Sequence, residues 1–147
     1  MKLVSRRWML LLAGILAACN LTDEFRADES PGVIADYSAG DTAQYFRTTA
    51  IGDVLTTPDG MTVYTYGKEV AGSPSCYGRC AEHWSAVLAP ARATASGDLT
   101  LLDRIDGSKQ WAFKNMALYT HDGDKAPGDV SGDNYDEGAW RAVRADR

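Results

Sequence analysis

The chain has 147 residues, 45% hydrophobic and 24% charged, which is enough for one domain or for two small halves that share one core. Its formal net charge of −5 at pH 7 becomes −8 without residues 1–18, because that segment holds three cations and no acid. A chain this acidic repels phosphate backbones, so we expect no nucleic-acid partner.

Residues 1–18 have the pattern of an export signal. Met1 to Arg7 is short and basic, and Trp8 to Ala18 is an apolar run of eleven residues. Such a run is too short to span a bilayer comfortably and is typical of the core of a signal peptide. The stretch Ser5-Arg6-Arg7 also looks like a twin-arginine export signal, so this route and general secretion both stay open.

The apolar run ends in Leu16-Ala17-Ala18-Cys19, which resembles the lipobox of bacterial lipoproteins. The resemblance implies that Cys19 becomes the mature N-terminus and carries several acyl chains such as palmitate. Several chains anchor a protein stably, at about 0.8 kcal/mol per buried methylene. Because Asn20 replaces the Asp that often signals inner-membrane retention, the outer membrane is favoured, facing the periplasm or the cell surface. The alternative is an ordinary signal peptide with Cys19 incidental.

Residues 19–48 are predicted to be a tether between the lipidated cysteine and the domain. The stretch from Asn20 to Asp41 is polar, acidic and poor in large apolar residues, as in linkers that form no core of their own. Val33-Ile34 and Tyr45-Phe46 are small apolar islands that we expect to dock on the domain.

Residues 49–147 contain one pattern twice, in copies of about 49–90 and about 98–147. Each copy leads from an apolar strand, at 61–66 and 116–121, to a Trp-x-Ala-Val segment. Units of this size usually cannot bury their apolar faces alone. We therefore expect the two copies to pack against each other about an approximate two-fold axis.

Turn signals divide each copy into short strands. Pro58-Asp59-Gly60 and Asp106-Gly107 are such signals, because proline presets a turn angle and glycine permits a positive φ. We predict a mainly β fold of duplicated antiparallel meanders with one or two short helical turns. A helical turn is expected within residues 81–87.

The repeated pattern resembles a family of bacterial lipoprotein repeat proteins, described as secreted repeats of unknown function and marked by Tyr-x-aromatic-x-x-Asp. The first copy ends in Glu where the family has Asp, and the second has His in the aromatic place. The motif positions are Tyr64, Tyr66, Glu69 and Trp84 in the first copy and Tyr119, His121, Asp124 and Trp140 in the second. The resemblance covers about residues 49–143. It implies an exported lipoprotein and supplies no activity.

Cys76 and Cys80 are the two cysteines that remain once Cys19 is lipidated. Outside the cytoplasm such a pair indicates a disulfide, which contributes about 2 kcal/mol for so small a ring. The alternative is a metal site, because Cys76, Cys80 and His83 are ligands that suit copper(I) or zinc in a reducing state. His121 is either a polar replacement at a strand end or a further ligand beside His83.

Motifs for catalysis are missing from the sequence: it has no Gly-x-Ser-x-Gly, no P-loop and no dinucleotide fingerprint. We expect a non-enzymatic envelope lipoprotein without a cofactor, whose domain binds or scaffolds an envelope protein or a small ligand. A periplasmic metal or redox protein that uses Cys76, Cys80 and His83 is the alternative. The repeated Tyr and Trp side chains form either the core or a ligand groove.

Overall fold

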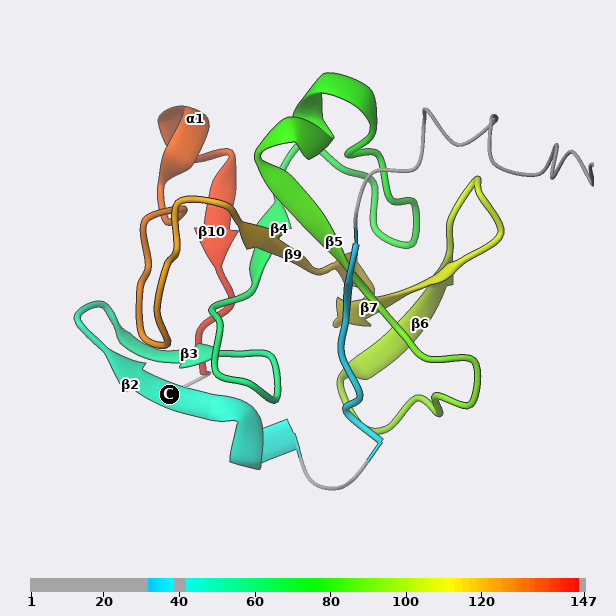
Figure 1. Ribbon diagram of the computed structural model, residues 1–147, viewed down its shortest axis with the longest axis horizontal. Helices are drawn as coiled ribbons and strands as arrows, with labels where there is room; N and C mark the ends of the chain where they lie inside the picture. The colour runs from blue at the N-terminus through cyan, green and yellow to red at the C-terminus, as the bar shows by residue number, and fades with distance from the viewer. Residues whose placement is uncertain (1–31, 39–41, 146–147) are drawn as a thin grey trace, which may run out of the picture.

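The computed structural model describes residues 32–38 and 42–145 (Figure 1). The predicted signal peptide and the lipidation of Cys19 lie outside these residues. Within the described part of the chain, no helix has the length and apolar character needed to cross a membrane.

Short strands account for most of the regular structure, so the prediction of a mainly β fold is confirmed. The strands are β1 (Val33–Ile34), β2 (Phe46–Thr49), β3 (Gly52–Leu55), β4 (Tyr64–Tyr66), β5 (Trp84–Leu88), β6 (Leu99–Asp103), β7 (Lys109–Phe113), β8 (Met116–Ala117), β9 (Tyr119–His121) and β10 (Trp140–Ala142). The helical pieces are the 3-10 turns η1 (Thr42–Tyr45) and η2 (Gly78–Glu82) and the short helix α1 (Tyr135–Gly138).

The helical turn expected within residues 81–87 lies earlier in the chain. It is η2, which ends at Glu82, and Trp84 starts a strand instead. The reason is tertiary: Trp84, Ala86 and Val87 are all buried, and β5 has neighbours in the sheet on both sides. A strand buried on both faces has no clean alternation of polar and apolar residues, so its sequence resembles a buried helical turn.

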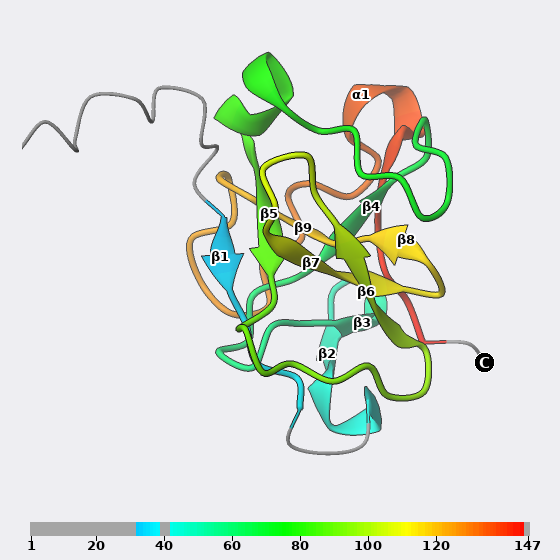
Figure 2. The ribbon, with the colours of Figure 1, turned by 90° about the vertical axis from the view of Figure 1, so that its right-hand side faces the viewer.

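The main sheet has the order β10-β4-β9-β5-β7-β6 (Figures 1 and 2). In addition, β1 pairs in parallel with β5, β8 pairs with β7, and β2 with β3 forms a separate two-stranded sheet. The antiparallel pair β4–β9 lies between the two copies, with Tyr64 opposite Tyr119. These tyrosines are equivalent motif positions, so the approximate two-fold relation passes between them.

The two repeats exchange their tryptophan strands. Strand β5 of the first repeat pairs with β9 of the second, where Trp84 lies opposite His121. Strand β10 of the second repeat pairs with β4 of the first, where Trp140 lies opposite Tyr66. Each repeat therefore completes the sheet of the other, which explains why neither copy has a core of its own.

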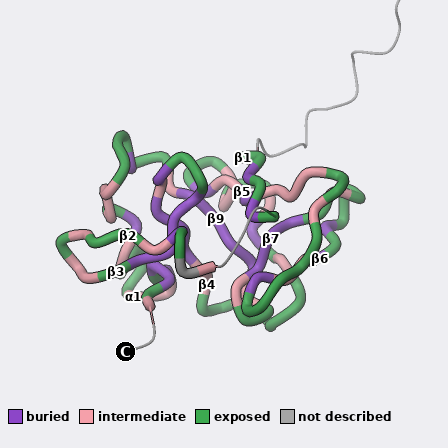
Figure 3. Tube along the Cα trace, turned by 90° about the horizontal axis from the view of Figure 1, so that it is seen from below, coloured by how far each residue is buried: buried purple, intermediate pink, exposed green. Residues whose placement is uncertain are grey.

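The core consists of two clusters of buried side chains, seen as the purple segments of the tube in Figure 3. One is centred on Tyr64, Tyr119, Trp84 and Trp140, and the other on Trp111 with the aliphatic residues around it. Trp111 and both tyrosines are fully buried. The repeated Tyr64, Tyr119, Trp84 and Trp140 are thus core side chains, whereas Tyr66 and His121 are only partly buried.

The N-terminal segment docks on the domain at the two expected apolar islands, since β1 pairs with β5 and Tyr45 is buried in the second cluster. The sequence did not indicate that Tyr37 joins this cluster. Tyr37 is 1% exposed and donates a hydrogen bond from its hydroxyl to the Thr56 carbonyl at 3.0 Å. The Trp111 indole donates to the Ala35 carbonyl at 2.8 Å. Residues 32–38 and 42–48 therefore belong to the fold, whereas residues 19–31 of the predicted tether lie outside the described residues. A lone tyrosine in an acidic stretch has no periodicity that could reveal its burial.

Candidate functional site

The motif acid of the second repeat receives a hydrogen bond from the motif tyrosine of the first. Tyr64 donates from its hydroxyl to Asp124 Oδ2 at 2.6 Å, and the Gly132 N–H donates to the Tyr64 hydroxyl oxygen at 3.3 Å. Ser131 completes the group, because its N–H and its hydroxyl donate to Asp124 Oδ1 at 2.9 and 2.5 Å. Burial, and then the bond to Asp124, raises the pKa of Tyr64, so the phenol stays a donor.

The other pair of motif residues repeats this arrangement. Tyr119 donates to Glu69 Oε1 at 2.5 Å, and the Cys76 N–H donates to the Tyr119 hydroxyl at 3.4 Å. The Ser75 N–H donates to Glu69 Oε1 at 2.8 Å. We call the two groups carboxylate clasps: Tyr64, Asp124 and Ser131 form the first, and Tyr119, Glu69 and Ser75 form the second.

The clasps differ in how they use the two oxygens of the carboxylate. Asp124 accepts on both, whereas in the second clasp every donor is directed to Glu69 Oε1. Glu69 Oε2 is buried without a hydrogen-bond partner. Glu69 is one methylene longer than Asp124, and its tyrosine and serine donors share one oxygen where those of Asp124 are divided over two. An unpaired buried oxygen of this kind destabilises the folded state.

Each clasp joins one repeat to the other, and this is what the family motif does in the chain. Glu69 follows Tyr64 by five positions, yet Glu69 binds Tyr119, and Tyr64 binds Asp124. The sequence contained one signal for these contacts, since Ser75-Cys76 and Ser131-Gly132 lie 56 positions apart in the two copies. It contained no signal that the partners would be crossed.

A stack of four rings lies beside the clasps and is also symmetric. Trp84 and Trp140 lie face to face with centroids 3.7 Å apart and planes 3° apart. Tyr66 stacks on Trp140 at 4.5 Å, and His121 lies against Trp84 at 4.4 Å. Tyr66 and His121 are the equivalent aromatic positions of the two motifs. The aromatic position of each motif therefore packs against the outer face of one tryptophan of the pair. In the second repeat the planar imidazole of His121 takes the place of the aromatic ring.

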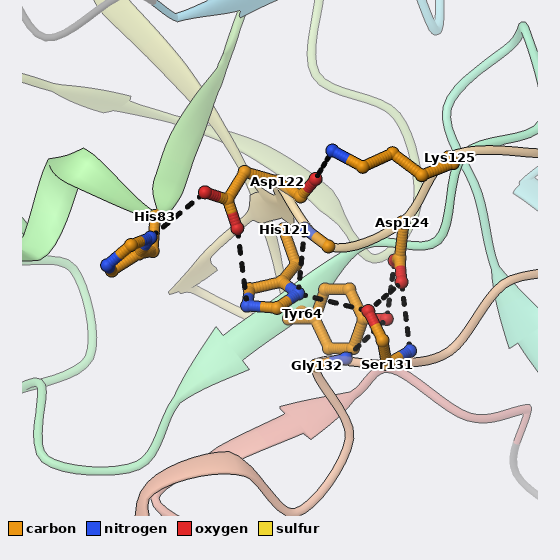
Figure 4. Close-up of polar contacts among 9 residues, drawn as sticks. Tyr64, His83, His121, Asp122, Asp124, Lys125, Ser131 and Gly132 are labelled. Atoms are coloured by element: carbon orange, nitrogen blue, oxygen red, sulfur yellow. Dashed lines mark hydrogen bonds and ion pairs between the residues drawn. The ribbon is translucent and has the colours of Figure 1, made fainter.

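The repeats differ most where both histidines of the chain meet one carboxylate (Figure 4). His83 Nδ1 is 2.9 Å from Asp122 Oδ2, and His121 Nε2 is 3.7 Å from Asp122 Oδ1. The hydrogen bond with Asp122 is the main cause that raises the pKa of His83, and the same bond lowers the pKa of Asp122. This group links the end of η2 in the first repeat to the end of β9 in the second.

Ser131, His121 and Asp122 lie in a line, but their hydrogen bonds do not suit nucleophilic catalysis. His121 Nδ1 is 3.1 Å from Ser131 Oγ. However, the Ser131 hydroxyl donates to Asp124, and the Gly123 N–H donates to His121 Nδ1 at 3.3 Å. The Gly132 N–H, the amide next to the serine, is bound to Tyr64 and is not directed at an oxyanion position. Ser75 is the equivalent serine of the other clasp, and the motif position equivalent to His121 is Tyr66, which is no base.

Cys76 and Cys80 form the predicted disulfide, with their Cα atoms 5.2 Å apart. In this oxidised state neither sulfur is a thiolate ligand. His83 is paired with Asp122 and His121 is packed against Trp84, so the four predicted ligands do not converge on one point. Within residues 32–38 and 42–145, no group of three or more His, Cys, Asp or Glu side chains is placed to hold a metal ion.

Comparison with known proteins matches the chain to a family model. No curated protein and no solved structure matches the chain. The model of a family described as a secreted repeat of unknown function matches residues 46–88 and 100–144, one match for each repeat. Together these matches cover more than half of the chain. The chain therefore belongs to the family of secreted repeats of unknown function.

Proposed function

We propose that the protein is a lipoprotein of the bacterial cell envelope, anchored in the membrane by acyl chains on Cys19. Three observations support the proposal. The family is described as secreted. The Cys76–Cys80 disulfide suits an oxidising compartment. The basic and apolar segments before Cys19 have the form of a lipoprotein signal.

The duplicated domain, in this proposal, is a binding or scaffolding module without enzymatic activity. The observation that carries this is the crossed use of the motif: both tyrosines and both acids hold the two repeats together. Groups that are buried and bonded to each other are not free to act on a substrate. A partner, whether an envelope protein or a small ligand, would then be recognised through the exposed loops, which differ between the repeats.

Labelled palmitate tests the anchor directly. Cells that make the wild-type protein should incorporate the label, and the protein should sediment with the membranes. Cys19→Ser should abolish both. Cys80→Ser is the matched control, because it also replaces a cysteine by serine but leaves the lipobox intact, so it should be labelled like the wild type. Wild-type protein that takes up no label, or labelled Cys19→Ser protein, would contradict the anchor.

The alternative is a periplasmic metal or redox protein that works through a reduced Cys76–Cys80 pair with copper or zinc. One contact favours it: the His83 N–H donates to the Cys80 carbonyl at 3.4 Å, so the imidazole follows directly on the turn that carries the cysteine. Elemental analysis of the reduced protein tests this alternative. Bound copper or zinc at one equivalent, lost in His83→Gln, would support it over the scaffold.

A further inference from the structure

We infer that the surface by which the repeats recognise each other also fits a second copy of this chain, so that two chains form a strand-exchanged dimer. In this dimer the first repeat of one copy pairs with the second repeat of the other, and the reverse. The inference concerns self-association and goes beyond the proposed anchor and binding role.

The pairing of the strands carries the inference. Among the described strands, β5 pairs with β9 and β7 of the second repeat and with β1, and with no strand of its own repeat. Strand β10 pairs with β4, which belongs to the first repeat. Both clasps and the Trp84–Trp140 stack also join one repeat to the other. All of these contacts would form equally well between repeats of two different chains.

The covalent link between the repeats is a connector of small residues, 89–98. Its middle is exposed, and the Ala93 N–H is bonded to the Pro90 carbonyl within the connector itself. Its two ends are held on the two sides of β7. The Ala89 N–H donates a hydrogen bond to the Lys109 carbonyl, and the Lys114 N–H donates one to the Asp98 carbonyl. Ser96 and Leu99 also exchange backbone hydrogen bonds at 3.0 and 3.1 Å, and Ala93 packs against the second cluster. Opening the connector costs the Ala93 contact but none of the contacts between β4, β5, β9 and β10, and exchange of identical elements is a low-cost route to a dimer.

Monomer and dimer would contain the same contacts, so their balance depends on concentration. A short flexible connector keeps the second repeat at an effective concentration of the order of 1 mM around the first. The monomer is favoured while the chain is much more dilute than this. The dimer is favoured at comparable concentrations, or when the connector is too short to close within one chain.

The register of the sheet gives the length that closure requires. Ala89 lies beside Lys109 and Leu99 lies opposite Phe113, so the connector runs the length of β7 while crossing from one side of it to the other. With about 3.4 Å per residue along the strand and about 4.8 Å between strands, the ends are about 17 Å apart. Removal of residues 91–96 leaves four Cα–Cα steps, which reach at most about 15 Å.

The deletion of residues 91–96 is therefore the test, with a Gly/Ser connector of the original length as its matched control. Light scattering should give twice the chain mass for the deletion variant and the chain mass for the control. The near-ultraviolet circular dichroism of both should match that of the wild type, because the tryptophan stack is kept. A folded monomer of the deletion variant would overturn the inference.

A second measurement decides the matter if the deletion variant does not fold. Two full-length preparations with different affinity tags are unfolded, mixed and refolded together at about 1 mM chain, near the effective concentration of the tethered repeat. A complex that carries both tags and has the mass of a dimer is expected, and it should disappear after refolding at a thousandfold dilution. Complete recovery of monomer at the high concentration would overturn the inference.

Discussion

Trp84 and Trp140 come from equivalent positions of the two repeats and stack face to face, with ring centroids 3.7 Å apart. Each indole is delivered by a strand that pairs with the other repeat. The stack therefore forms when the two repeats interlock, and it reports on that event alone.

Replacement of either tryptophan should reveal this contact. Coupled indoles give a paired signal in circular dichroism, and Trp84→Phe should abolish it while the secondary structure is kept. A double-mutant cycle with Trp140→Phe should give about 0.5–1.5 kcal/mol of coupling, as is typical of aromatic pairs. Trp111→Phe is the matched control, because Trp111 is buried in the other cluster and should leave the paired signal intact.

Shortening Glu69 should stabilise the protein. In Glu69→Asp the carboxylate can adopt the arrangement of Asp124, which removes the buried and unpaired Oε2. We expect a gain of about 1 kcal/mol in the free energy of unfolding, measured in urea. The reverse change, Asp124→Glu, should destabilise by a similar amount. A Glu69→Asp protein that is less stable than the wild type would contradict this explanation.

The disulfide should contribute modestly, because it closes a small ring. Reduction, or Cys80→Ser, is expected to lower the free energy of unfolding by about 2 kcal/mol and to leave the fold intact. Native mature protein should have no titratable thiol at Cys76 or Cys80. Two reactive thiols together with bound copper or zinc would instead support the metal-binding alternative.

The sequence predicted the features that depend on local pattern. The duplication was visible because Tyr64 and Tyr119, with the tryptophans that follow them, recur in register. The disulfide was visible because two cysteines lie close together in an exported chain. The mainly β fold followed from turn signals between short apolar runs.

The features that depend on contacts between distant residues were not predictable. The spacing of the motif is equally compatible with a bond from Tyr64 to Glu69 of its own copy and with a bond to Asp124 of the other. The pairing of β4 with β9 across the two copies decides it, because this pairing brings Tyr64 to Asp124. Burial of Tyr37 likewise depends on a cluster formed by residues far along the chain.

Stability should depend on pH through His83 and Asp122. The folded-state pKa of His83 is raised above its ordinary value of 6.5, mainly by its bond to Asp122. The stabilisation of the folded state by this pair is therefore fully present below pH 6.5 and is lost as the pH rises through the raised pKa of His83. The pKa of Asp122 is lowered, so the acidic limit is reached as the pH falls through a value below 3.8.

Urea unfolding at a series of pH values measures this effect. His83→Gln should unfold at lower urea concentration than the wild type between these limits, and the two should converge at alkaline pH. The difference should be small and should shrink in high salt, because both side chains are largely exposed. A difference that grows with rising pH would contradict the assignment.

The crossed clasp between Tyr64 and Asp124 is tested most directly by a pair of double-mutant cycles. Tyr64→Phe combined with Asp124→Asn should show a coupling of at least about 1 kcal/mol, because a buried charge-assisted hydrogen bond is removed. Tyr64→Phe combined with Glu69→Gln, within one copy of the motif, should be additive to within about 0.5 kcal/mol. Coupling within the copy and additivity across the copies would contradict the interlocked arrangement of the two repeats.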